Sequence, residues 1–229
     1  EDEGRDLLLS LCNELVFSQE GRSLGPMDKT GRLTLIFKMK GNPKDTKNWR
    51  PIVIQPAFTS MLSKMVNTRL SHFSLTTSMI SRSQKCNIRN IFGTRDDVFL
   101  VKAMLADAHI SLALGLPADL VLVVTDHEKA FDRVQKGLID EALSHFYPDM
   151  APNLKRFITQ LYTDGRISIT DDDDQWAIIQ KLAGVLQGDS LSGFLFNLVS
   201  EYGKLRSNPA LLASSGYRMR KRPSLPIMD

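Results

Sequence analysis

One short apolar run constrains the fold of this chain more than any other feature of its sequence. Residues 120–125 are leucine and valine up to a final threonine, and a single carboxylate, Asp126, follows them. Runs of this kind are typical of buried strands. The sequence therefore predicts a buried strand that presents Asp126 at its carboxyl end, with the aromatic Phe131 five residues later. An aspartate in that position can also cap the following helix or close a turn, so the run alone assigns no catalytic role.

A second segment, GVLQGDSLSGFLFNLVSE at residues 184–201, predicts a tight turn that leads into a helix. Gly184 and Gly188 bracket Gln187, and glycine tolerates unusual backbone dihedrals and a close approach of ligand. Asp189 or Ser190 is a candidate N-cap. Gln187 would then lie at a helix N-terminus, a position suited to nucleotide or phosphate. The apolar side chains of the predicted helix recur at helical spacing: Leu191, Phe194, Leu195, Leu198, Val199, Tyr202 and Leu205.

Apolar periodicity and turn residues predict the other elements. Four consecutive aspartates at residues 171–174 interrupt a predicted hairpin. They lack the ligand spacing and internal glycine of a calcium loop, so we interpret them as a solvent-exposed turn. The further predicted helices are residues 7–16, 58–73, 98–112, 138–146 and 154–161, and the further predicted strands are residues 33–37, 52–55, 166–170 and 176–179.

Taken together, these segments resemble the polymerase motifs of reverse transcriptases, most closely those of non-LTR retrotransposons. Residues 125–132 read TDHEKAFD, where the family carries an aspartate, two variable residues and then Lys-Ala-Phe-Asp. Residues 184–193 read GVLQGDSLSG, where the family carries Gly-Val-Arg-Gln-Gly-Asp-Pro-Leu-Ser-Pro. Residues 33–54 resemble the fingers motif that ends in Asn-Trp-Arg-Pro-Ile, and residues 84–105 resemble a weaker motif. The chain departs from the family at His127, Leu186, Ser190 and Gly193.

The resemblance implies an α+β fold, in which right-hand polymerase fingers precede an incomplete palm whose antiparallel sheet packs on helices. It implies an N-terminal extension at residues 1–32, fingers at residues 33–115 and a palm at residues 116–229, truncated before the thumb. The chain ends in Ile227, Met228 and Asp229. We interpret Asp229 as the first aspartate of the third polymerase motif. We accordingly expect the chain to be inactive alone.

The chemistry that the resemblance implies is RNA-templated DNA synthesis by two-metal nucleotidyl transfer. The partners would be an RNA template, a DNA primer and deoxynucleoside triphosphates, and the cofactor two Mg²⁺ ions, with Mn²⁺ as an alternative. Asp126 and Asp229 would be catalytic metal ligands, and His127 would add only its backbone carbonyl. Phe131 would exclude the ribose 2′-hydroxyl. The implied nucleotide-binding residues are Lys38, Lys40, Arg50, Phe131, Gln187 and Gly188.

Two other interpretations stay open: a catalytically decayed RNA-binding module, and a remnant of a degenerate element without function. Composition agrees with a nucleic-acid partner without deciding among them. The net charge of the 229 residues is +3, but basic residues cluster at residues 29–50 and 218–222, and such tracts attract phosphate backbones. Cys12 and Cys86 suggest no disulfide framework, which favours a reducing, intracellular compartment, nuclear or cytoplasmic. No apolar run is long enough to span a bilayer.

Overall fold

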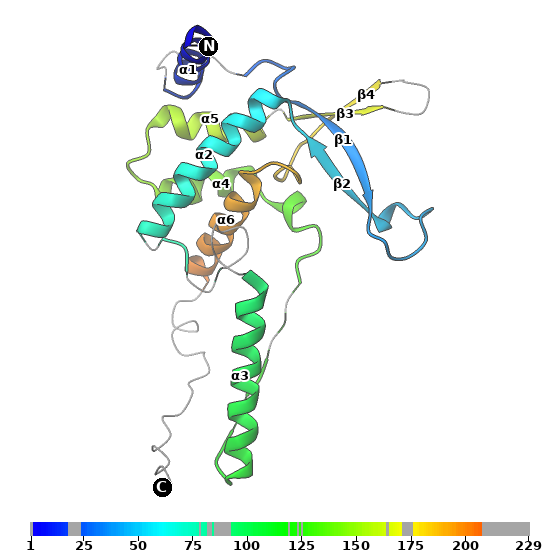
Figure 1. Ribbon diagram of the computed structural model, residues 1–229, viewed down its shortest axis with the longest axis vertical. Helices are drawn as coiled ribbons and strands as arrows, with labels where there is room; N and C mark the ends of the chain where they lie inside the picture. The colour runs from blue at the N-terminus through cyan, green and yellow to red at the C-terminus, as the bar shows by residue number, and fades with distance from the viewer. Residues whose placement is uncertain are drawn as a thin grey trace.

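The computed structural model describes residues 2–17, 24–77, 79–81, 84, 93–118, 120–122, 124, 126–163, 165–170 and 176–207. These residues form a group of packed helices beside a twisted sheet, with one long helix extending away from both (Figure 1). The predicted α+β class is confirmed. The predicted terminal site residue Asp229, the basic tract at residues 218–222 and the aspartates at residues 171–174 lie outside the described residues.

The sheet joins two hairpins that are far apart in sequence. Strand β1 (Thr30–Phe37) pairs antiparallel with β2 (Trp49–Ile54), and β3 (Arg166–Thr170) pairs antiparallel with β4 (Trp176–Gln180). Between the hairpins, β1 runs parallel to β3, which gives the order β2-β1-β3-β4. The expected antiparallel pairing therefore holds within each hairpin, and the sheet as a whole is mixed. A strand of the predicted fingers thus pairs with a strand of the predicted palm.

The helices end close to where the apolar periodicity and the helix-breaking residues predict. Helix α4 stops before Pro148, and α5 begins at Pro152, where the fixed backbone angle of proline suits a first turn. The α-helices are α1 (Asp2–Phe17), α2 (Ala57–Thr76), α3 (Gly93–Ala113), α4 (Lys136–Phe146), α5 (Pro152–Tyr162) and α6 (Ser192–Arg206), and the two 3-10 turns are η1 (Thr46–Asn48) and η2 (Ala130–Arg133).

Helix α6 lies in the middle of the hydrophobic core. Its first two turns bury the side chains that the sequence pattern assigned to a core face, and they pack with apolar residues of α2, α4 and α5. The predicted N-cap is wrong, because the N-cap residue is Leu191 and no side chain caps the helix. The Asp189 carboxylate instead accepts hydrogen bonds from the Tyr162 and Ser192 hydroxyls. The buried side chains of α6 and its entry are Leu191, Phe194, Leu195 and Leu198.

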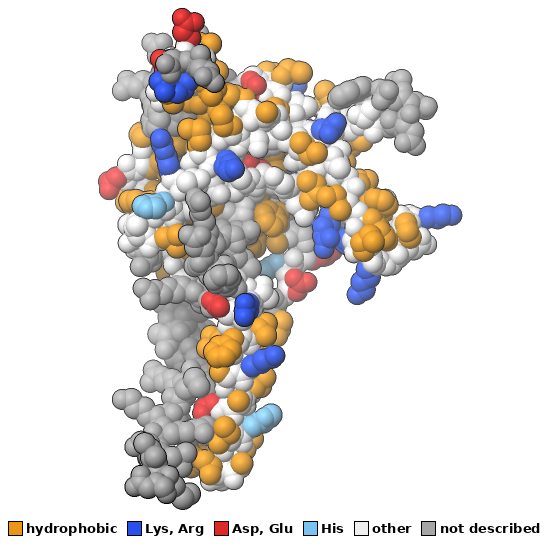
Figure 2. Space-filling model, in the orientation of Figure 1, with side chains coloured by type: hydrophobic (Ala, Val, Ile, Leu, Met, Phe, Trp, Pro, Cys, Tyr) orange, Lys and Arg blue, Asp and Glu red, His pale blue; other side chains and the backbone are white. Residues whose placement is uncertain are grey.

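Helix α3 forms where the sequence predicts a helix, but it does not enter the core. It projects from the other helices (Figure 1), and hydrophobic side chains lie along its visible surface (Figure 2). Phe99, Leu105 and Leu112 are exposed on it. No described helix, α3 included, combines the length and the apolar character needed to cross a membrane.

The predicted buried strand before Asp126 is wrong. None of its described positions is in a strand, and the Val124 side chain is 82 % exposed. A strand requires neighbours that accept and donate its backbone hydrogen bonds. The described strands pair only with one another, in the order β2-β1-β3-β4. A valine-rich run indicates a preference for strand but supplies no partner.

Candidate functional site

The turn that carries Gln187 is bonded to two segments from other parts of the sequence. The Val53 amide of β2 donates to the Gln187 carbonyl at 2.8 Å. On the other side, the Val185 amide donates to the Phe131 carbonyl at 2.9 Å, and the Gly184 amide donates to the Val134 carbonyl at 2.9 Å. The three segments that the sequence singles out, at residues 33–54, 126–134 and 184–201, therefore meet at this turn.

The two glycines of the turn are required by this close contact. Gly184 has φ +82° and Gly188 has φ +117°, in the region that favours glycine. A Cβ on Gly184 would lie 2.6 Å from the Phe131 carbonyl oxygen, and one on Gly188 would lie 2.8 Å from the Val53 carbonyl oxygen. Larger residues would push the turn away from both η2 and β2.

The far side of the turn is fixed by polar groups from α5 and α2. The buried Tyr162 hydroxyl donates to the Asp189 carboxylate, and Asn67 donates to the Ser190 carbonyl at 2.9 Å. Burial raises the pKa of the Tyr162 hydroxyl well above its usual range, and the adjacent Asp189 carboxylate raises it further. The second oxygen of Asp189 is buried and has no hydrogen-bond donor among the described residues.

Phe131 lies in η2, half-buried between the core and the surface. Its ring stacks on Phe196 of α6, with ring centroids 5.5 Å apart. The preceding Lys129 has left-handed backbone angles, φ 51° and ψ 45°, which are uncommon for lysine. Its carbonyl accepts from the Asp132 amide at 3.0 Å and the Arg133 amide at 3.1 Å. Strained backbone of this kind gathers at functional sites.

Four of the six predicted nucleotide-binding residues line one cavity of about 680 Å³ between the β1–β2 hairpin and η2. Lys38 and Arg50 line it from the hairpin, and Phe131 and Gln187 line it from the opposite side. Gly188 lies in the same turn as Gln187 and contacts β2. Lys40 is not among the described residues that line the cavity.

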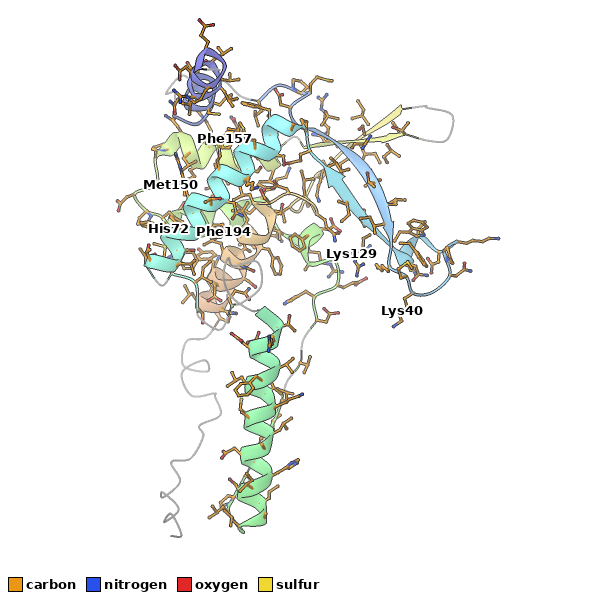
Figure 3. All side chains as sticks on the ribbon, in the orientation of Figure 1. Lys40, His72, Lys129, Met150, Phe157 and Phe194 are labelled. Carbon is orange, nitrogen blue, oxygen red and sulfur yellow. The ribbon has the colours of Figure 1, made fainter. Side chains whose placement is uncertain are left out.

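The hairpin and the turn at Lys129 form opposite sides of this region. In Figure 3, Lys40 lies near the end of the hairpin, and Lys129 lies between the hairpin and the helices. Positively charged side chains project from the hairpin end in Figure 2. The Lys38 ammonium donates to the Lys47 carbonyl at 2.7 Å, which holds that side chain along the hairpin.

The sequence analysis did not assign two of the cationic residues that line this cavity. Lys47 and Lys129 line it with Lys38 and Arg50, so four cationic side chains face two acidic ones, Glu128 and Asp132. Lys47 belongs to the basic tract, and Lys129 is the lysine of the Lys-Ala-Phe-Asp string. That string was the available signal for Lys129, whereas only the hairpin geometry separates Lys47 from the other lysines of its tract.

Asp126 and His127 are exposed and line a neighbouring cavity of about 400 Å³. Glu128 and Ala130 line both cavities, so the two adjoin. Mg²⁺ takes one or two protein carboxylates and completes its shell with water and substrate phosphate, and an exposed aspartate beside a cationic cavity fits that chemistry. The described residues contain no cluster of three or more side chains able to hold a metal ion.

Comparison with solved structures identifies the fold. Two structures of telomerase from Candida tropicalis match with TM-scores of 0.57 and 0.55, each at 12% identity. The first match covers 90% of this chain and 41% of that chain. The second, a telomerase in complex with a fragment of telomeric RNA, covers 93% of this chain and 37% of that chain. At this identity the two matches show a shared fold, so the chain folds like part of telomerase.

Comparison with known sequences identifies relatives of the chain. The chain is 30% identical over 207 residues to the retrovirus-related Pol polyprotein of the type-1 retrotransposable element R2 from Popillia japonica, which covers 89% of the chain and 27% of the relative. It is also 30% identical over 174 residues to an uncharacterized 149 kDa protein of transposon TX1 from Xenopus laevis, covering 74% and 12%. No protein-family model matches.

The homologues of this chain, at 30% identity over most of its length, are therefore proteins of non-LTR retrotransposons. The chain spans well under a third of the length of either relative.

Proposed function

We propose that this chain carries the nucleotide-binding part of an RNA-templated DNA polymerase. The observation that carries the proposal is the single cavity lined by Lys38, Arg50, Phe131 and Gln187. Those residues come from three separate segments of the sequence, and the resemblance to reverse transcriptases had assigned all of them to one nucleotide. A cavity with more cations than acids suits the triphosphate of such a substrate.

Each side of the cavity has a distinct task in this proposal. Arg50 is exposed and presents a planar guanidinium that suits bidentate contact with phosphate oxygens, and no described side chain pairs with it. Lys38 and Lys47 add two more cations on the same hairpin. Opposite them, Phe131 would lie beneath the sugar and Gln187 against the nucleotide and the template base.

Asp126 would hold divalent ions at the border between the two cavities, with the His127 carbonyl beside it. When bound, Mg²⁺ or Mn²⁺ would stabilise the attacking and leaving oxygens of the phosphoryl transfer. Asp229 stays a predicted ligand, because it lies outside the described residues. Asp126 itself is exposed, and its carboxylate is open to solvent and to substrate.

The template and primer would contact the protein through phosphates. The end of the β1–β2 hairpin carries exposed lysines, Lys40 and Lys44, that do not line the cavity. Basic side chains of this kind bind a nucleic-acid backbone without reading its sequence, and their contribution falls with added salt. We assign Lys40 to this backbone contact and no longer to the nucleotide.

Primer extension on an RNA template tests the proposal, with the chain carried in its full-length protein. Arg50→Ala should raise the KM for dTTP by about tenfold or more, since a charged contact with phosphate is lost. Lys44→Ala removes an exposed cation from the same hairpin outside the cavity and serves as the control. Its KM for dTTP should stay within about twofold of wild type.

Other outcomes distinguish the remaining interpretations. RNA binding that weakens with salt, without metal-dependent extension, would support an RNA-binding module in place of an enzyme. Neither binding nor extension would support a functionless remnant. An equal effect of Arg50→Ala and Lys44→Ala on the KM for dTTP would contradict the proposal that the nucleotide binds in this cavity.

A further inference from the structure

Lys181 lies immediately after β4 and inserts its side chain between the two turns of the site. The side chain is 13 % exposed. Its ammonium donates to the Val185 carbonyl at 2.8 Å and forms an ion pair with the Asp132 carboxylate at 3.3 Å. The backbone amide of Lys181 donates to the Gly165 carbonyl at 2.8 Å, which fixes where the side chain begins. The ammonium therefore connects η2 to the turn that carries Gln187.

Asp132 is the acid of this pair, and it lines the cationic cavity. Its side chain is 54 % exposed, so part of the carboxylate faces the space where an anionic ligand would lie. A carboxylate in the wall of a polyphosphate site repels the ligand, and the repulsion increases as water is excluded. The other acid of the wall, Glu128, pairs with Arg133 at 3.2 Å, but both of those side chains are far more exposed.

We propose that Lys181 is a positioning residue that makes the cavity compatible with a polyphosphate. It neutralises the Asp132 carboxylate from behind the cavity wall and holds the Phe131 turn against the Gln187 turn. The inference rests on the proposed function in so far as the ligand is a nucleoside triphosphate. Lys181 does not line the cavity, so it acts through Asp132 and Val185 and does not touch the ligand.

The chain contains its own reporter for ligand binding. Trp49 lines the cavity, and its indole N–H donates to the Pro43 carbonyl at 2.8 Å. The only other tryptophan of the sequence is Trp176. In a Trp176→Phe background, the fluorescence of the full chain therefore reports on the cavity wall. The probes are inorganic tripolyphosphate and dTTP, each titrated with Mg²⁺.

Lys181→Met should weaken the binding of both probes by about tenfold, because an unpaired carboxylate now faces the ligand. The double variant Lys181→Met with Asp132→Asn should return the affinity to within about threefold of wild type, because the repelling charge is gone. Lys136→Met is the matched control. Within the described ranges Lys136 donates only to the Lys181 backbone carbonyl, at 3.4 Å, and its loss should leave the affinity unchanged.

The single variant Asp132→Asn tests the inference about Lys181 even if Lys181→Met does not fold. With the acid removed and Lys181 retained, both probes should bind about threefold tighter than to wild type. Equal or weaker binding would overturn the inference, as would a double variant no better than Lys181→Met. Failure of the wild-type chain to bind either probe would overturn it as well. Polyphosphate binding that follows these expectations, in a protein that extends no primer, would instead overturn the proposed polymerase function alone.

Discussion

The Val185 amide donates a 2.9 Å hydrogen bond to the Phe131 carbonyl, although 54 positions of sequence separate the two residues. Phe131 belongs to the turn that follows Asp126, and Val185 precedes Gln187 by two residues. Together with the bond from the Gly184 amide to the Val134 carbonyl, this bond joins the turn that carries Gln187 to the turn that carries Phe131. On the other side, β2 reaches the Gln187 turn through the Val53 amide and the Gln187 carbonyl, at 2.8 Å.

Gly184→Ala should lower the free energy of unfolding by about 2–4 kcal/mol. The added Cβ would meet the Phe131 carbonyl oxygen at 2.6 Å, and the backbone at φ +82° is strained for alanine. Urea denaturation of the full chain measures the change. Gly203→Ala is the control, because a Cβ there meets nothing within 4 Å and α6 gains about 0.5–1 kcal/mol from alanine. Equal effects of the two substitutions would contradict the packing described at Gly184.

Tyr162→Phe should destabilise the chain by about 1.5–3 kcal/mol near neutral pH, since the half-buried Asp189 carboxylate loses a hydrogen-bond donor. The loss of unfolding free energy caused by Tyr162→Phe should become smaller above about pH 10. Because the folded-state pKa of Tyr162 is raised, its contribution is fully present below the unfolded pKa of about 10 and is lost as pH rises toward the folded value.

Unfolding curves in urea between about pH 8 and about pH 11 test this pH dependence. Tyr202→Phe is the matched control. The Tyr202 hydroxyl donates at 3.2 Å to the exposed Glu141 carboxylate, so its removal should cost less than about 1 kcal/mol. A difference between Tyr162→Phe and wild type that stays constant across the alkaline range would contradict the assignment of a raised pKa.

Phe131→Ala should relax discrimination against ribonucleotides in primer extension. The ring lines the cavity and is held in place by its stacking on Phe196, so its removal opens space where a 2′-hydroxyl would lie. The measurement is the ratio of kcat/KM for dTTP and UTP. Phe131→Tyr retains the bulk and should keep that ratio within about threefold of wild type. If the ratio of kcat/KM for dTTP and UTP is unchanged in Phe131→Ala, the proposed steric role of Phe131 is wrong.

Leu195→Ala should cost about 2–5 kcal/mol, because the side chain is fully buried in the core and its loss leaves a cavity. Leu105→Ala, on α3, should cost less than about 1 kcal/mol. Its side chain is 42 % exposed. Urea denaturation compares the two, and a larger cost at Leu105 would mean that α3 is buried in solution.

The helices were predictable because their apolar residues repeat every three or four positions and glycine or proline bounds them. Residues 58–73, 138–146 and 154–161 lie inside α2, α4 and α5. Periodicity indicates an apolar face but does not say what covers it. It therefore described α3 correctly as a helix and could not reveal that Phe99 and Leu112 are exposed.

Strand prediction failed where a strand would have depended on pairing with a neighbouring strand. The hairpin strands β3 and β4 pair with each other over a short loop, so their local pattern was sufficient. Residues 120–125 have a stronger preference for strand than either, yet they form none among the described positions. Strand formation is decided by backbone hydrogen bonds to a neighbour, which a local pattern does not contain.

The candidate site was predictable in part, because the motifs carry their residue types in fixed order. Lys38, Arg50, Phe131 and Gln187 meet at one cavity. Lys47, Lys129 and Lys181 were missed, since their places depend on hairpin twist and on the contact between two turns. Lys40 was assigned to the nucleotide by the resemblance to the fingers motif, and it is not among the described residues that line the cavity. The roles of all these residues, and the fingers and palm boundaries, stay predictions.

Primer extension by Asp126→Asn tests the central claim most directly, in the full-length protein with an RNA template and Mg²⁺. The loss of a metal-binding carboxylate should reduce extension by more than about 100-fold. Affinity for template and primer should stay within about threefold, because phosphate contacts are intact. Asp149→Asn, at an exposed aspartate outside both cavities, should extend as wild type does. Extension by Asp126→Asn at the wild-type rate would contradict the account.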